Sequence, residues 1–267
     1  MKLWERIIKG FIIGASMLVP GVSGGTMAII LGVYNEMIHA VSTLKQKFKE
    51  NGLLLIIYGI SALVGILFFA KPMLAAVTLW NKPMMYLFMG AIIASIPPLY
   101  RRVRVARIRP VNMLVAVFGA ALGVCIKFLP EGLFIPSQAL SIGGVLLLLV
   151  AGVIIAIALV LPGISASYIL LMMGMYDLTL LALQQLDLPY LIPLVIGILS
   201  GTYFTAGVLE RQMERHPQFT YMLIIGFMIG SLVEVFPGMP EGIESIYCLL
   251  TFIIGLGVIL WIGRRRV

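Results

Sequence analysis

Six apolar runs, each long enough to cross a bilayer as a helix, constrain this chain more than any other feature of its sequence. The runs comprise residues 53–70, 84–100, 112–129, 190–209, 218–236 and 245–263. Hydrophobic residues make up 61% of the 267 residues and charged residues only 11%, and no soluble domain can bury so much apolar surface. The runs also lack the alternating pattern of a transmembrane β-barrel. The sequence therefore predicts an all-α, polytopic integral membrane protein.

The charged residues gather between the apolar runs. Lys and Arg occur in short clusters, which read KLWERIIK, KQKFKE, RRVRVARIR, ERQMERH and GRRR. Cytoplasmic loops of membrane proteins carry such clusters, because positively charged loops are retained inside. Membrane topology therefore explains the net charge of +8 better than nucleic acid binding does. Anionic membrane lipids are the expected partners of these clusters, and no nucleic acid partner is expected.

Two of the apolar segments contain residues that break helices. VPGVSGGT occupies residues 19–26, and LPGISASY occupies residues 161–168. The arm before the first break, residues 7–19, forms only about 20 Å of helix, which is too short for a hydrocarbon core of about 30 Å. We expect it to enter the membrane, turn at PGVSGG, and return as one helix through MAIILGVYNEMI. Such a break at membrane depth must be buried in protein or line a cavity.

The chain also repeats itself. A shift of 142 residues superposes the two broken segments without a gap, and it matches Pro, Gly, Ser and Tyr residues that apolar composition does not explain. The matched pairs include Gly10/Gly152, Pro20/Pro162, Gly21/Gly163, Ser23/Ser165, Gly32/Gly174 and Tyr34/Tyr176 and, at a shift of 136 residues, Gly90/Gly226 and Ser95/Ser231. We therefore predict a single membrane domain, residues 1–267, built from two repeats, residues 1–135 and 136–267.

Charge counts predict how the two repeats are oriented. If each broken segment (about 7–44 and 139–186) enters and leaves on the same side, each repeat crosses the membrane three times. Sixteen of the 19 Lys and Arg residues then lie in the cytoplasm, together with both termini. An odd number of crossings turns the second repeat upside down relative to the first. Inverted repeats with broken helices are typical of secondary transporters.

The broken segments suit an anion. Each break frees amide N–H groups that carry partial positive charge, and the hydroxyls of Ser23 and Thr26 add donors. Two such tips that meet near the midplane form one site for a phosphate, sulfate or carboxylate. The predicted substrate site comprises Pro20, Gly21, Ser23, Gly24, Gly25, Thr26, Tyr34, Gly163, Ser165, Ser167, Tyr168 and Tyr176. The alternative is a kink at which small residues allow helices to pack closely.

Few other side chains suggest chemistry. Candidates for proton or cation coupling are Glu36, His39, Asp177 and Glu210, and candidates for phosphate capture at the cytoplasmic mouth are Arg101 and Arg102. Residues of these types also serve membrane interfaces and topology anchoring. Cys125 and Cys248 lie inside apolar runs without a nearby histidine or second cysteine, so we expect them to pack, with no metal site and no cofactor.

The first broken segment resembles the undecaprenyl-phosphate translocase family of the PopT type. The resemblance rests on PGVSGGT from Pro20 to Thr26, on Ala28, Gly32 and Tyr34, and it covers essentially the full chain. The second copy, Pro162 to Tyr176, is looser, since Ala166 and Ser167 replace two glycines. The resemblance implies a flippase in a bacterial or archaeal cytoplasmic membrane. Its expected substrate is the lipid carrier undecaprenyl phosphate, returned from the outer to the cytoplasmic leaflet for reuse in peptidoglycan and other envelope polymers.

Two other functions fit the same residues. A transporter or channel for a small soluble anion would use the same two tips. A membrane lipid phosphatase is less favoured, because a nucleophile needs a positioned base or a metal, and neither His39 nor His216 stands beside another titratable residue in a motif. We therefore predict a transporter rather than an enzyme. The sequence leaves its oligomeric state open.

Overall fold

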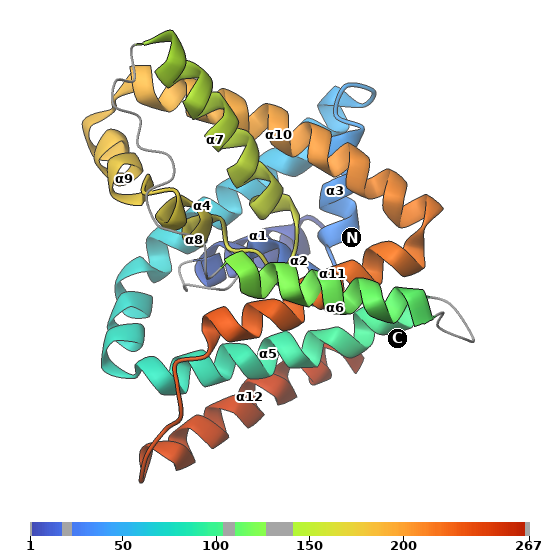
Figure 1. Cartoon of the computed structure of the whole chain (residues 1–267), viewed down its shortest axis with the longest axis vertical. Helices are drawn as coiled ribbons and strands as arrows, with labels where there is room; N and C mark the ends of the chain where they lie inside the picture. The colour runs from blue at the N-terminus through green and yellow to red at the C-terminus, as the bar shows by residue number, and fades with distance from the viewer. Residues whose placement is uncertain (1, 18–22, 104–109, 127–140, 265–267) are drawn as a thin grey trace.

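The computed structural model describes residues 2–17, 23–103, 110–126 and 141–264, and every structural statement below refers to these ranges. They form helices without strands (Figure 1). The helices are α1 (Leu3–Met17), α2 (Gly24–Ile30), α3 (Tyr34–Ser42), α4 (Phe48–Leu79), α5 (Asn81–Arg102), α6 (Pro110–Ile126), α7 (Ile142–Val160), α8 (Ala166–Met172), α9 (Tyr176–Gln185), α10 (Leu188–Arg215), α11 (Pro217–Val235) and α12 (Glu244–Arg264). The all-α architecture predicted from the sequence is confirmed.

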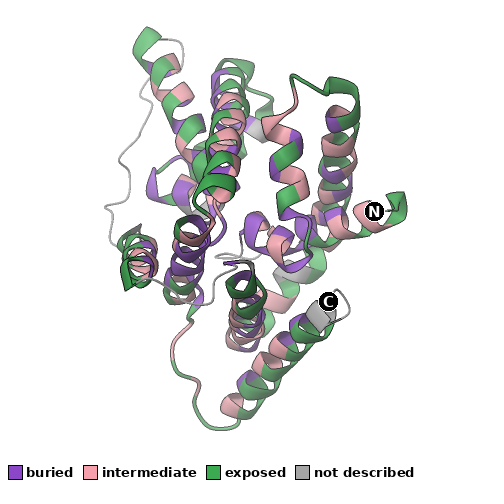
Figure 2. Ribbon diagram, turned by 90° about the vertical axis from the view of Figure 1, so that its right-hand side faces the viewer, coloured by how far each residue is buried: buried purple, intermediate pink, exposed green. Residues whose placement is uncertain are grey.

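Six helices within these ranges are long and apolar enough to cross a membrane, namely α4, α5, α7, α10, α11 and α12. Each predicted apolar run overlaps a helix, although α6, with 17 residues, is among the shorter ones. The 19 apolar residues of α7 qualify as a span, although we expected only part of a broken segment there. Exposed residues cover the outward faces of the helices (Figure 2), and they include Leu67, Leu199 and Phe204. Such faces suit contact with lipid tails, as expected of a multi-pass membrane protein.

Glycines allow the helices to pack closely in pairs. The strongest pairings join α1 with α4 and α7 with α10. A Cβ atom added at Gly14 in α1 would overlap the backbone carbonyl of Ala62 in α4. In the second pairing, a Cβ atom added at Gly152 would overlap the carbonyl of Leu194. Backbones at such small separations are typical of membrane helices, because packing between them replaces the hydrophobic effect that lipid does not supply.

Two further pairings link the first half of the chain to the second half. α5 packs against α12, and α6 packs against α11, again through glycines that leave no room for a Cβ atom. Gly90 and Gly255 form the first crossing, and Gly226 and Gly119 form the second. Gly90 and Gly226 are 136 residues apart, as are Gly119 and Gly255, which is the offset that aligned the sequence with itself. The division into two repeats is otherwise untested and stays a prediction.

The returning arm of each broken segment is two short helices rather than the single helix that we expected. α2 and α3 are separated by Gly32, with φ at 65°, and α8 and α9 are separated by Gly174, with φ at 71°. The amide of Val33 donates to the carbonyl of Ala28, and the corresponding amide of Met175 donates to Leu170. This is the Schellman arrangement, which ends a helix at a residue in the left-handed region and therefore favours glycine.

Figure 1 shows the two broken segments entering from different sides. α1 begins to the right of centre and runs into the middle of the molecule, and α3 leads to the upper right, where α4 begins. α7 begins at the upper left and also runs to the middle, while α9 leads into α10 on the left. Helices α5, α10 and α12 end at the right, where α6 and α11 begin. Buried residues concentrate where these elements meet in the interior (Figure 2).

Candidate functional site

The first predicted tip is closed by its own serine. Ser23 precedes α2, and its side-chain oxygen accepts a hydrogen bond of 3.2 Å from the amide of Gly25. A serine at this position satisfies one of the amides that the start of a helix leaves without a partner. Ser23 is 4% exposed and Thr26 is 2% exposed. Pro20 and Gly21, which belong to the predicted site, lie outside the described residues.

The two tips touch, as the sequence predicted. The amide of Gly163 donates a hydrogen bond of 3.0 Å to the hydroxyl oxygen of Thr26. Gly163 has φ at 89°, and a Cβ atom there would lie 2.7 Å from the backbone nitrogen of Met228 in α11. On the other side, a Cβ atom at Gly25 would lie 3.3 Å from the Cα atom of Pro162. The second tip is therefore held between the first tip and the backbone of α11.

The remaining members of the second tip are less well defined. Ser165 is buried next to this contact, and its carbonyl accepts from the amide of Ile169 in α8. Ser167 and Tyr168 lie in α8, but their side chains fall outside the described part of the structure. Whether any of the tip residues binds an anion stays a prediction.

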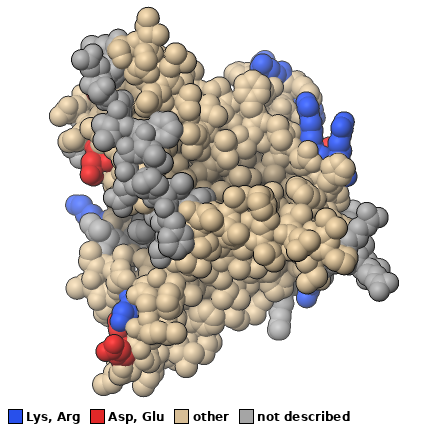
Figure 3. Space-filling model, in the orientation of Figure 1, with Lys and Arg blue, Asp and Glu red and all other residues tan. Residues whose placement is uncertain are grey.

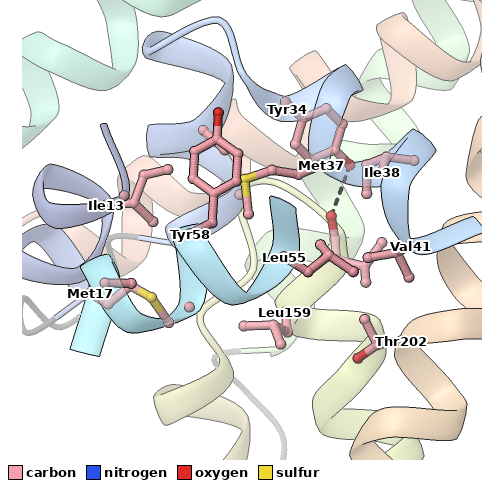
Figure 4. A pocket seen from close by; sticks show the side chains of 17 residues that line it. Ile13, Met17, Tyr34, Met37, Ile38, Val41, Leu55, Tyr58, Leu159 and Thr202 are labelled. Carbon is pink, nitrogen blue, oxygen red and sulfur yellow. Dashed lines mark hydrogen bonds between the residues drawn. The ribbon is translucent and has the colours of Figure 1, made fainter. Parts of the chain in front are cut away.

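The two matched tyrosines have different surroundings. Tyr34 is buried, and its hydroxyl donates a hydrogen bond of 2.8 Å to the carbonyl of Val160, the last residue of α7 (Figure 4). The bond satisfies one of the carbonyls that the end of a helix leaves without a partner. Tyr176 begins α9 and is 37% exposed. Only Tyr34 of the pair lies against the tips.

A cavity of about 300 Å³ lies beside the first tip. Figure 4 shows side chains from α1, α3, α4 and α7 converging on it. Its lining comprises Gly10, Ile13, Met17, Gly24, Gly25, Ala28, Tyr34, Met37, Ile38, Val41, Leu55, Tyr58, Gly59, Ala62, Leu159, Val160 and Thr202. The sequence analysis did not find this cavity, because apolar residues at helical spacing look the same whether they form a core or line a space. Gly24 and Gly25 connect the cavity to the start of α2.

The ionisable candidates separate into two groups. On α3, Glu36 pairs with Arg6 at 2.6 Å, and His39 Nδ1 lies 2.5 Å from the carboxylate of Glu210 on α10. The hydroxyl of Ser42 also donates to Glu210. Asp177 is exposed on α9, which lies on the opposite side of Figure 1 from α3.

The two arginine candidates stand apart from these pairs. Arg101 is exposed near the end of α5, and the side chain of Arg102 falls outside the described part. The structure thus brings Glu36, His39 and Glu210 together along α3 and leaves Asp177 and Arg101 elsewhere. Among the described residues, no group of three or more His, Cys, Asp or Glu side chains is placed to hold a metal ion.

Comparison with known proteins identifies the family. A family model described as undecaprenyl phosphate translocase-like matches residues 13–247. The chain belongs to this family. A relative named polyprenyl-phosphate transporter, from Staphylococcus aureus (strain NCTC 8325 / PS 47), is 32% identical over 98% of this chain and 96% of its own. A second protein of that name, from Vibrio cholerae serotype O1, is 28% identical over 89% of this chain and 79% of its own. No solved structure gives a significant match.

Membership of the translocase-like family confirms the resemblance that the first broken segment suggested. The family and both relatives carry the names of transporters rather than of enzymes, which supports the predicted class. The family match extends over α2, α3, α8 and α9, so both tips and the cavity lie within it. Arg6 lies before its first residue, although the first relative covers nearly the whole chain.

Proposed function

We propose that this protein is a flippase that returns undecaprenyl phosphate from the outer to the cytoplasmic leaflet of the cell membrane, with the phosphate held at the hairpin tips. One observation carries the proposal: an apolar cavity of about 300 Å³ adjoins the polar backbone of the first tip at Gly24 and Gly25. The substrate is likewise an apolar chain that ends in one anionic group. The names of the two relatives, which are polyprenyl-phosphate transporters, support the same substrate class.

The size of the cavity suits the head of the lipid rather than its whole length. Ligand pockets for small molecules span about 300–1,000 Å³, so this one is at the small end of that range. It accommodates the phosphate and the first part of the chain, while the rest of the polyprenyl tail stays in the bilayer. The hydroxyls of Ser23 and Thr26, which accept hydrogen bonds from protein amides, each retain a proton to donate to a phosphate.

The proposed mechanism is alternating access between inverted repeats with re-entrant hairpins. Three observations support it. The hairpins enter from different sides in Figure 1, the turns at Gly32 and Gly174 match, and the glycine crossings recur at an offset of 136 residues. Lys and Arg side chains gather at the right-hand edge in Figure 3, where α10 and α12 end, which supports a cytoplasmic position for that side and for both termini. A shared tip site would then be reached from each face in turn.

The direction of transport requires an energy source. Moving one negative charge inward against an inside-negative potential of about 100 mV costs about 2.3 kcal/mol. We propose coupling to protons or to another cation, which would offset this cost. Of the groups predicted from the sequence, Glu36, His39 and Glu210 are the candidates that the structure brings near the cavity, because Met37, Ile38 and Val41 on the same helix line it.

The lining separates this proposal from transport of a small soluble anion. Among the described lining residues, only Tyr34, Tyr58 and Thr202 carry polar side chains. A soluble anion would have to leave its hydration shell for an apolar wall, whereas a lipid tail gains from the same wall. Competition by inorganic phosphate or sulfate, with no binding of a polyprenyl phosphate, would favour the soluble-anion alternative instead.

A leaflet-specific experiment tests the proposed function. In cells that lack this protein and any redundant carrier, undecaprenyl phosphate should accumulate in the outer leaflet, measured as sensitivity to an agent that binds it there. The double variant Ser23→Ala with Thr26→Val should behave in the same way when its abundance is normal. Ser200→Ala is the control, because this exposed hydroxyl bonds only to carbonyls of its own helix. Unchanged exposure in the depleted cells would rule out the proposed function.

A further inference from the structure

Three helices contribute to a polar cluster at the edge of the cavity. Arg6 on α1 donates from Nη2 to Glu36 Oε1 on α3 at 2.6 Å, and the hydroxyl of Tyr58 on α4 donates to the other carboxylate oxygen at 3.2 Å. The side chains of Arg6 and Glu36 are 27% and 29% exposed, so the pair is largely removed from solvent. A charged pair in such a position must be well matched to be tolerated.

The match is incomplete on the side of the arginine. The Nε atom of Arg6 is buried and has no hydrogen-bond partner, and among the described residues it is the sole buried side-chain nitrogen or oxygen in that condition. A buried donor without an acceptor is unfavourable and therefore uncommon. Guanidinium offers Nε and Nη together as a fork that fits two oxygens of one phosphate or carboxylate. Glu36 occupies one arm of that fork, and the other arm lacks an acceptor.

The cluster adjoins the cavity rather than the outer surface. Tyr58 lines the cavity, as do Met37, the residue after Glu36, and Gly10, one helical turn after Arg6 (Figure 4 labels Tyr58 and Met37). Apolar walls thus lead to a guanidinium at one edge of the cavity. This is the arrangement that binds an amphiphile with a single oxyanion head.

We propose that Arg6 receives a phosphomonoester head group on the side of the cavity where α1 begins, and that Glu36 occupies the guanidinium until the phosphate displaces it. The proposal rests on the proposed function and assigns it a second phosphate site, besides the tips. A phosphate fits both arms of the fork and carries about 1.5 to 2 negative charges at neutral pH, so it competes with a singly charged carboxylate that uses one arm. The hydroxyl of Tyr58 holds Glu36 after the exchange.

An exchange of this kind differs measurably from a structural ion pair. If Arg6 and Glu36 only joined α1 to α3, removing either charge would weaken ligand binding alike, through the same loss of structure. If Glu36 competes with the phosphate for Arg6, removing the carboxylate frees the guanidinium. The two variants then change phosphate binding in opposite directions.

The experiment measures equilibrium binding of farnesyl phosphate to the purified full-length protein in detergent, with farnesol and inorganic phosphate as comparison ligands. Arg6→Gln should weaken binding of farnesyl phosphate by about tenfold or more, as expected for loss of a charge-assisted bond, and leave binding of farnesol unchanged. Glu36→Gln should tighten binding of farnesyl phosphate several-fold. Lys82→Gln and Glu244→Gln are matched controls, because that ion pair of 3.0 Å lies outside the cavity lining, and neither should change binding.

The outcomes separate the inference from the proposed function. If the wild-type protein does not bind farnesyl phosphate more tightly than farnesol, both fail. If it does, and Arg6→Gln binds equally well or Glu36→Gln weakens binding, only the inference is overturned. If inorganic phosphate competes at the concentration at which it binds alone and farnesol adds nothing, the site takes free phosphate rather than a lipid head. Should Arg6→Gln fail to fold, Arg6→Lys keeps the charge without the fork, and unaltered affinity in that variant overturns the assignment.

Discussion

The two hairpins share a backbone design but differ in what surrounds it. Both turn at a glycine in the left-handed region, Gly32 or Gly174, and both are followed two residues later by a tyrosine. In the first hairpin, α3 packs against α10 and Tyr34 is buried. In the second hairpin, α9 contacts mainly its chain neighbours, α8 and α10, and its leucines at 178, 180 and 181 are exposed. The same turn thus serves a site in one half and an outward-facing helix in the other.

This difference assigns unequal roles to the hairpins. The first hairpin lines the cavity through α2 and α3, and it carries the paired side chains Glu36 and His39. The second hairpin contributes backbone: the carbonyl of Val160 and the amide of Gly163 are its bonds to the first. We infer that side chains of the first hairpin determine binding and that the second hairpin sets the position of the tips.

Gly163→Ala should have the largest effect of any single change that tests this division. A left-handed φ costs a non-glycine residue about 1–2 kcal/mol, and the new Cβ atom would also lie 2.7 Å from the backbone of Met228. We expect loss of folded protein, measured as the monodisperse yield and the apparent melting temperature in detergent. Gly207→Ala is the control, because a Cβ atom there meets nothing within 4 Å. A variant at Gly163 as stable as this control would show that the second tip does not position the first.

The matched tyrosines provide the next test. Tyr34→Phe leaves the buried carbonyl of Val160 without its donor, which should lower the free energy of unfolding by about 1–3 kcal/mol. Tyr176→Phe removes an exposed hydroxyl and should change stability by less than about 0.5 kcal/mol. Thermal unfolding of the two variants, side by side with wild type, measures the contrast. Equal losses in both would contradict the asymmetry of the hairpins.

The turn glycines should instead behave alike. Gly32→Ala and Gly174→Ala both place a side chain at positive φ, so each should lose about 1–2 kcal/mol of stability. Melting temperatures of the two variants, and of the double variant, test whether the turns are equivalent. A large loss at one position with none at the other would mean that the shared sequence pattern does not reflect a shared structural need.

The parts of this molecule that were predictable are those with local signals. Apolar runs predicted the helices, and glycine with proline predicted the breaks, because both depend on residues close together in the chain. The turn at Gly32 was predictable too: the sequence analysis matched Gly32 with Gly174 but did not ask what backbone conformation a glycine there would serve. The 19 residues of α7 were misjudged as a partial arm, because the proline at 162 was taken as a midpoint rather than as the end of a full-length helix.

The parts that were not predictable depend on distance in sequence. Arg6 was counted only among the cytoplasmic charges, and its pairing with Glu36, 30 positions along the chain, depends on how α1, α3 and α4 come together. The cavity and the bond from Tyr34 to Val160 depend in the same way on tertiary packing. No periodicity encodes such contacts, so they required the structure.

The smallest effect should come from the ion pair at the end of α3 where α4 follows. His39 lies largely in solvent, and exposed pairs contribute only about 0–1 kcal/mol, so His39→Gln should leave the apparent melting temperature nearly unchanged. Glu210→Gln should cost somewhat more, because that carboxylate also accepts from Ser42 and is less exposed than the imidazole. A loss of several kcal/mol from His39→Gln would mean that this pair anchors α3 to α10. The first hairpin would then depend on its charges for its fold, and the contrast with the second hairpin would be one of stability rather than of binding.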